Sequence, residues 1–181
     1  PHYWKNRPPV PGYWQQDVHY VIKARMDDET DVLTADLSLT YWNNSPDTLR
    51  QVFFHLYQGA FVQGSYLERL EGGLRKTKDG AIDYAGTRIS SLSQNGTELQ
   101  REQDNTVLKV MLAEPLEPGS RTTFRIAFTT AWTMDVYRRM KLFDSWGNKH
   151  YDGVHWYPRI AVYDARFGWD TQQHLGSEFY G

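Results

Sequence analysis

The chain has 181 residues, of which 40% are hydrophobic, and this length is enough for one domain with a sizeable buried core. Its formal net charge of -2 gives no overall basic character, so we expect no nucleic-acid partner, and the absence of cysteine excludes disulfides, cysteine-ligated zinc and thiol catalysis. No apolar run approaches the roughly 20 residues that span a bilayer, so we expect no membrane span.

The first half of the chain alternates between apolar and polar residues with a period of two, which is typical of half-buried strands. Residues 17–26 and 33–41 alternate in this way around an acidic turn, so they predict an antiparallel hairpin. In the first of these strands one face carries Val18, Tyr20, Ile22, Ala24 and Met26, and the other carries Asp17, His19, Lys23 and Arg25. A third strand is predicted at residues 52–57.

The following strands are separated by strong turn signals. Residues 88–93 and 97–102 flank Asn95-Gly96, which favours a tight hairpin, and further strands are predicted at 107–112 and 123–128. About seven or more strands with polar turns between them predict an all-β fold, an antiparallel β-sandwich or saddle with long loops and little helix.

Two stretches lack this period. Residues 59–86 contain six glycines and a short predicted helix at 65–70, which Gly72-Gly73 is expected to end. A connection of this length is usually functional or mobile. Residues 133–153 have no periodicity and are predicted to form a surface loop. There is no internal repeat and no sign of a second domain, so residues 1–181 are interpreted as a single domain.

Several motifs recur in an order that is familiar from one family. They are Tyr13-Trp-Gln-Gln-Asp-Val-His-Tyr20, Tyr41-Trp-Asn-Asn-Ser-Pro-Asp-Thr-Leu49 with Phe54-His-Leu56, Pro115-Leu-Glu-Pro-Gly119, Trp156-Tyr-Pro158, Tyr163-Asp164, Gly168-Trp169 and Glu178-Phe-Tyr180. In this order they resemble the N-terminal β-domain of bacterial M1-type zinc metallopeptidases, the superfamily of aminopeptidase N and leukotriene hydrolase.

The resemblance implies a domain that packs on a catalytic domain of the same parent chain and forms one wall of the groove for a peptide substrate. It also implies a periplasmic or secreted protein. In that family zinc is bound downstream by a His-Glu-x-x-His helix, and no His-Glu pair occurs in these 181 residues. We therefore expect no catalytic residue and no cofactor in this chain, zinc in a catalytic domain that is absent from it, and a β-domain truncated at its C-terminal end.

The aromatic C-terminal stretch carries the candidate residues for the substrate groove or the domain interface, which are Trp156, Tyr157, Arg159, Asp164 and Trp169. An arginine and an aspartate among aromatic rings can bind a peptide. The competing interpretation is that Arg159 and Asp164 form a buried ion pair with each other.

A weaker hypothesis concerns metal binding by His150, Asp152 and His155, which are all residue types that zinc accepts. The spacing of five between the histidines fits neither a helical pair nor one face of a strand, so hydrogen-bonded loop histidines are the competing interpretation.

Two alternative functions stay open. The first is a stand-alone β-sandwich module that binds, for example, carbohydrate, in which some of the seven tryptophans would stack on sugar rings. The second is a domain of an inactive peptidase homologue that has lost its zinc ligands.

Overall fold

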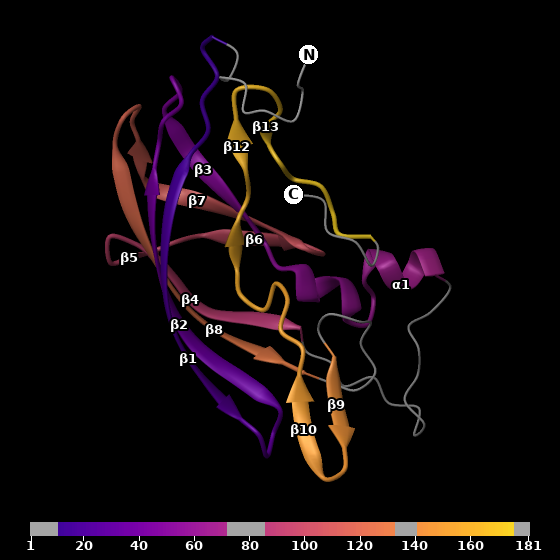
Figure 1. The fold of residues 1–181 in the computed structure, drawn as a ribbon. Helices are drawn as coiled ribbons and strands as arrows, with labels where there is room; N and C mark the ends of the chain where they lie inside the picture. The colour runs from indigo at the N-terminus through magenta and orange to yellow at the C-terminus, as the bar shows by residue number, and fades with distance from the viewer. Residues whose placement is uncertain (1–10, 72–85, 133–140, 176–181) are drawn as a thin grey trace, which may run out of the picture.

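The computed structural model describes residues 11–71, 86–132 and 141–175, and the regular secondary structure of this part of the chain is almost entirely β (Figure 1). The expected all-β antiparallel class is confirmed, with two short helices, η1 (Tyr57–Phe61) and α1 (Tyr66–Glu71). The strands are β1 (Asp17–Asp27), β2 (Val32–Trp42), β3 (Leu49–His55), β4 (Thr87–Gln94), β5 (Thr97–Glu98), β6 (Arg101–Asp104), β7 (Val107–Leu116), β8 (Arg121–Ala131), β9 (Leu142–Ser145), β10 (Asn148–Tyr151), β11 (Arg159–Ile160), β12 (Tyr163–Asp164) and β13 (Gly168–Trp169).

The larger sheet has five strands in the order β1-β2-β8-β4-β5, and all its pairings are antiparallel. The predicted hairpin is confirmed, because β1 and β2 pair from Asp17 opposite Trp42 to Asp27 opposite Val32. Its turn begins at Asp27, whose carboxylate accepts hydrogen bonds from the backbone N–H groups of Glu29 and Thr30. β2 pairs with β8 over the same eleven residues.

The second sheet has four strands in the order β11-β3-β7-β6, and its inner face packs on the inner face of the first. The strand predicted at 97–102 is in fact two strands, since β5 belongs to the first sheet and β6 to the second. Leu99 lies buried at the crossing, and its N–H donates to the carbonyl of Leu92. The chain therefore changes sheet within a polar stretch, residues 97–104, in which Leu99 is the single buried residue.

The main core lies between the two sheets and consists of side chains from the inner-facing positions of both. Phe54 of β3 meets Phe124 of β8 edge to face, with ring centroids 5.9 Å apart and an angle of 90° between the planes. The largest fully buried side chains of this layer are Tyr41, Phe54, Phe124, Phe128, Leu37, Leu39, Leu56, Leu92, Ile126 and Val52.

The C-terminal strip (residues 141–175) runs along one side of the molecule, from the β9–β10 hairpin at the lower end of the view to β12–β13 at the upper end (Figure 1). The prediction of a surface loop is wrong for residues 142–151, which form this hairpin, while residues 133–140 lie outside the described residues. Its turn has positive φ at Trp146 (55°) and Gly147 (75°), which fits a two-residue hairpin turn.

The helix expected at 65–70 is present as α1, and the glycines expected to end it, Gly72 and Gly73, lie outside the described residues. No helix in the described part of the chain has the length and apolar character of a transmembrane segment.

Asn43 connects the ends of the two sheets. Its buried side-chain Nδ2 donates to the carbonyl oxygens of Asp47 (2.7 Å) and Leu116 (2.9 Å), and its Oδ1 accepts from the N–H and the hydroxyl of Ser45. Its backbone N–H donates to the carbonyl of Ser120. One side chain thus satisfies polar groups of the turn after β2 and of the end of β7.

Replacing Asn43 by alanine leaves these carbonyl groups without their donor in a buried environment. We expect Asn43→Ala to lower the free energy of unfolding by about 2–4 kcal/mol, measured by urea denaturation. Asn44→Ala is the matched control, because the Asn44 side chain is exposed and its loss should cost less than about 1 kcal/mol. Equal losses for the two variants would contradict the structural role of Asn43.

Candidate functional site

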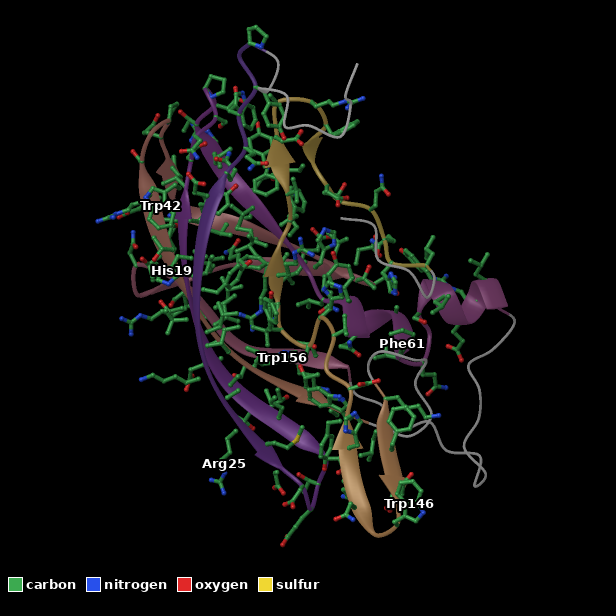
Figure 2. The ribbon with its side chains drawn as sticks, in the orientation of Figure 1. His19, Arg25, Trp42, Phe61, Trp146 and Trp156 are labelled. Carbon is green, nitrogen blue, oxygen red and sulfur yellow. The ribbon has the colours of Figure 1, made fainter. Side chains whose placement is uncertain are left out.

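Three of the five predicted site residues, Trp156, Tyr157 and Trp169, lie where the C-terminal strip packs on the core. Trp169 stacks on Tyr163 (centroids 4.7 Å apart, planes at 16°) and lies parallel to the buried ring of Tyr41 at 6.4 Å. Trp156 meets Tyr157 edge to face at 5.4 Å. Trp156, Tyr157 and Trp169 are all partly buried and pack against the main core. The structure therefore gives these aromatic residues a packing role (Figure 2).

The aromatic layer is fixed by polar contacts at its rim. The hydroxyl group of Tyr163 donates to the Asp47 carboxylate (2.8 Å), and burial together with this carboxylate raises the pKa of Tyr163 to about 12. The hydroxyl group of Tyr20 accepts a hydrogen bond from the backbone N–H of Ile160 (2.9 Å). These bonds attach β12 and β11 to the first half of the chain.

The fold places Arg159 and Asp164 in different parts of the C-terminal strip. Asp164 accepts hydrogen bonds from the N–H groups of Arg166 (2.9 Å) and Phe167 (2.7 Å), and it closes the turn between β12 and β13. Arg159 lies on β11 opposite His55 of β3. Within the described ranges there is no ion pair between Arg159 and Asp164.

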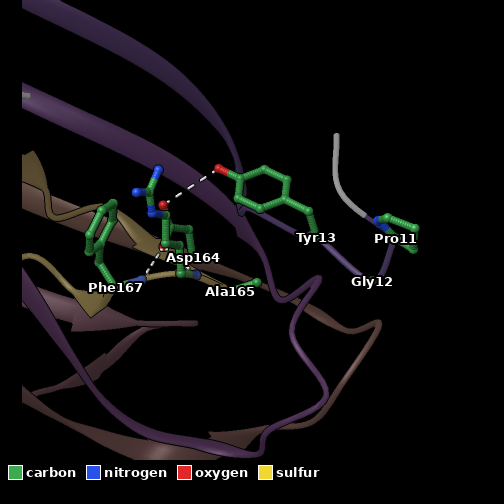
Figure 3. Close-up of a pocket in the computed structure, with 7 residues that line it drawn as sticks. Pro11, Gly12, Tyr13, Asp164, Ala165 and Phe167 are labelled. Carbon is green, nitrogen blue, oxygen red and sulfur yellow. Dashed lines mark hydrogen bonds between the residues drawn. The ribbon is translucent and has the colours of Figure 1, made fainter. Parts of the chain in front are cut away.

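A shallow cavity of about 800 Å³ lies beside Asp164 (Figure 3). It is lined by Tyr13 and the segment before it and by the β12–β13 turn, in which the Arg166 guanidinium lies 4.7 Å from the centroid of the exposed Phe167 ring. Asp164 points its second carboxylate oxygen to the hydroxyl group of Tyr13, 3.5 Å away. The cavity thus offers aromatic surface next to the Asp164 carboxylate, which already accepts hydrogen bonds from Tyr13, Arg166 and Phe167.

The structure also brings together a histidine–tyrosine cluster (His55, Tyr57, His155 and His174) that the sequence did not indicate. The Tyr57 ring is stacked on His55 (5.0 Å between centroids, 15° between planes), and His155 (4.6 Å) and His174 (5.7 Å) lie against it. Nε2 of His55 is 3.8 Å from the Asp170 carboxylate. The members come from β3, η1 and two separate segments of the C-terminal strip, so no short-range pattern in the sequence indicates that they lie together.

Burial controls the protonation of this cluster. It lowers the pKa of His174 to about 4, together with smaller contributions from the nearby His155 and His55. Burial also lowers the pKa of His55, although the Asp170 carboxylate opposes this change. Both imidazoles are therefore neutral near pH 7.

The three residues considered for a metal site are divided between two places. Nε2 of His150 lies 3.5 Å from Asp152 Oδ1, with both side chains largely exposed, whereas the His155 ring packs on Tyr57. Within residues 11–71, 86–132 and 141–175, no group of three or more His, Asp or Glu side chains is arranged to hold a metal ion.

No protein-family model matches the chain, and no curated protein matches it. Among solved structures, it is similar to an M1 zinc metallopeptidase from Deinococcus radiodurans, with 20% identity and a TM-score of 0.43 over 66% of this chain and 21% of that chain. It is also similar to two-domain M1 zinc metallopeptidase mutants bound to L-tryptophan (19%, TM-score 0.44, 70% and 23%) and to L-arginine (19%, TM-score 0.43, 68% and 22%). The chain thus spans less than a quarter of the length of these proteins.

The buried histidines make stability depend on pH. The unfolded imidazole of His174 has a pKa near 6.5, and the folded one about 4, so between these values only the unfolded state takes up a proton. We expect the free energy of unfolding to be highest above pH 6.5 and to fall, by up to roughly 3 kcal/mol for this residue, as the pH decreases towards 4.

Urea denaturation at pH 7.5 and pH 5 measures this loss. His174→Gln should reduce the difference between the two pH values, and His19→Gln, which replaces an exposed histidine, should leave it as in the unmodified chain. If His174→Gln keeps the full pH dependence, His174 is not its source.

Proposed function

We propose that the chain is the N-terminal β-domain of an M1-like zinc metallopeptidase, which packs on the catalytic domain of the same parent chain and forms one wall of its peptide groove. The ordered motifs from Tyr13 to Trp169 support this proposal, because they resemble the family over almost the whole chain. The same resemblance supports a periplasmic or secreted location.

The proposed packing on a catalytic domain rests on the distribution of exposed hydrophobic side chains. Nine large hydrophobic residues are exposed in the described part of the chain, and five of them lie in the C-terminal strip, the shortest of the three described ranges. They are Phe143, Trp146, Val162, Phe167 and Leu175. Exposed apolar side chains concentrated on one segment are typical of a surface that packs on another polypeptide.

In this proposal the domain has no catalytic step of its own. The described residues form no group suited to zinc, and we assign no part of the zinc chemistry to them. The contribution of the described residues is structural. Trp156, Tyr157 and Trp169 pack on the core and hold the C-terminal strip against it. A rigid strip can position a neighbouring domain and its substrate.

A second candidate function rests on Trp146. It is 97% exposed at the tip of the β9–β10 hairpin, whereas the five other tryptophans that the structure describes are buried or partly buried (Figure 2). An exposed indole ring can stack on a sugar ring, as in carbohydrate-binding modules. Titration with oligosaccharides distinguishes the two functions, since quenching and a blue shift of tryptophan fluorescence favour the binding module.

The direct test of the proposed function is to read the coding sequence beyond Gly181. A downstream His-Glu-x-x-His followed by a further glutamate supports the peptidase domain. A stop codon, or a following domain without these ligands, overturns it. The purified chain should also show no aminopeptidase turnover, and turnover that is lost on chelation would contradict the assignment.

The docking surface can be tested in the full-length parent. We expect the double variant Trp146→Ser, Phe167→Ser to weaken the contact between the domains, so that calorimetry resolves two unfolding transitions where the parent shows one. Val21→Ser is the control, because Val21 is 50% exposed but lies on β1, outside the C-terminal strip. A single unchanged transition in the double variant would show that these two side chains do not contribute to docking.

A further inference from the structure

The longest free sheet edge in the described part of the chain belongs to β1. This strand has eleven residues and pairs only with β2, whereas the edge strands β5, β6 and β11 of the two larger sheets have two, four and two residues, and no strand of the two-stranded sheets β9–β10 and β12–β13 has more than four. An isolated bridge between Gln15 and Asp164 ends just before β1 begins. From Asp17 onward, alternate residues of β1 therefore present backbone N–H and C=O groups that no described strand pairs.

Positive charge is concentrated in the middle rows of the outer face of the five-stranded sheet, the face turned away from the core. The strand register fixes which residues are neighbours there. Each row is read from β1 across β2 and β8 to β4. One row is Lys23, Asp36, Ala127 and Ser91. The adjacent row is Arg25, Thr34, Thr129 and Arg88. The row on the other side is Val21, Ser38, Arg125, Ser93. These three rows hold four cations and one carboxylate, while Asp17 and Asp27 lie on the same face at the two ends of β1 and Glu98 of β5 lies opposite Ser93.

Lys23 and Arg25 lie at the end of these rows, directly on the free edge. Figure 2 shows the side chain of Arg25 projecting away from the second sheet. A shallow cavity of about 450 Å³ lies over the same face, with Lys23 and Val21 of β1 on one side, Arg125 on the other, and the small side chains of Ser38 and Ala127 between them. The edge therefore combines free backbone groups, two cations and room beside them.

We propose that β1 binds an extended acidic peptide as an additional strand of the sheet. The peptide backbone pairs with the free edge, and carboxylates on alternate peptide residues lie next to Lys23 and Arg25. The intervening peptide side chains then lie on the inner side, beside Val18 and Ile22, where apolar residues fit. Backbone pairing provides affinity in this binding mode, and the side chains at alternate positions provide specificity.

A second copy of the chain fits this edge less well. If two β1 strands pair antiparallel over their full length, Asp17 of each strand lies opposite Asp27 of the other, at both ends of the pair. Like charges directly opposite each other destabilise a strand pair. An acidic partner strand avoids both contacts, because its carboxylates face cations.

Three peptides with capped ends separate the contributions of charge and of backbone pairing. The first is Thr-Glu-Val-Glu-Val-Glu-Thr, the second has lysine in place of each glutamate, and the third is the acidic peptide with its backbone nitrogens methylated. Binding to the full 181-residue chain is followed by calorimetry, and hydrogen exchange locates the protected amides. We expect the acidic peptide to bind at least about tenfold more tightly than the other two and to protect amides of β1.

The double variant Lys23→Glu, Arg25→Glu should lose this preference and favour the lysine peptide. The matched control is Arg88→Glu, which lies in the same row as Arg25 but three strands from the edge, and it should bind the acidic peptide as the unmodified chain does. Circular dichroism checks that the variants fold.

Three outcomes overturn the proposal. If the methylated peptide binds as well as the acidic one, only charge attraction is present. If the unmodified chain self-associates through β1, the occupant is a second copy. If no peptide binds and the unmodified chain stays monomeric, Lys23 and Arg25 only protect the edge against aggregation. None of these results bears on the docking of the C-terminal strip, which does not include β1.

Discussion

The pairing of β2 with β8 is the constraint on which the rest of the structure depends. Their eleven paired residues alternate strictly between the two faces, so a shift of one residue would turn every buried side chain outward. With the register fixed, Leu37 and Leu39 lie beside Ile126 and Phe124 on the inner face, and this apolar surface receives the second sheet. β1 and β4 then add to the two sides of the pair, and the positions of their outward side chains follow from the same register.

Much of this architecture could be predicted from the sequence, because period-two alternation and turn residues are local signals. The β1–β2 hairpin appeared at its predicted place for this reason. The failures have equally physical causes. The change of sheet at Leu99 falls between Thr97 and Glu102, a stretch without glycine, proline, asparagine or any other turn signal, so nothing in the sequence divides β5 from β6. The β9–β10 hairpin was missed because a tryptophan, Trp146, stands at a left-handed turn position that asparagine or glycine normally occupies.

The candidate site could likewise be predicted only in part from the sequence. Trp156, Tyr157 and Trp169 are close in sequence and were recognised as one aromatic stretch, and all three do pack against the main core, Trp156 beside Phe128 and Trp169 beside Tyr41. Their exposure could not be predicted, since it depends on where Tyr41 and Tyr20 approach them from the first sheet. The histidine–tyrosine cluster joins residues more than a hundred positions apart. Only the folding of the C-terminal strip onto β3 and η1 brings these residues together, and no spacing in the sequence encodes that contact.

The burial of Asn43 has a consequence for producing the protein. Asn43-Asn44-Ser45 fits the acceptor sequence for N-linked glycans, and a eukaryotic secretory pathway can modify such a site before the chain folds. A sugar on the Asn43 amide nitrogen would occupy the space that the carbonyls of Asp47 and Leu116 fill in the folded domain. Glycosylated chains could not close the end of the sandwich, whereas the exposed Asn95-Gly96-Thr97 can carry a glycan without entering the core. A bacterial host avoids this conflict.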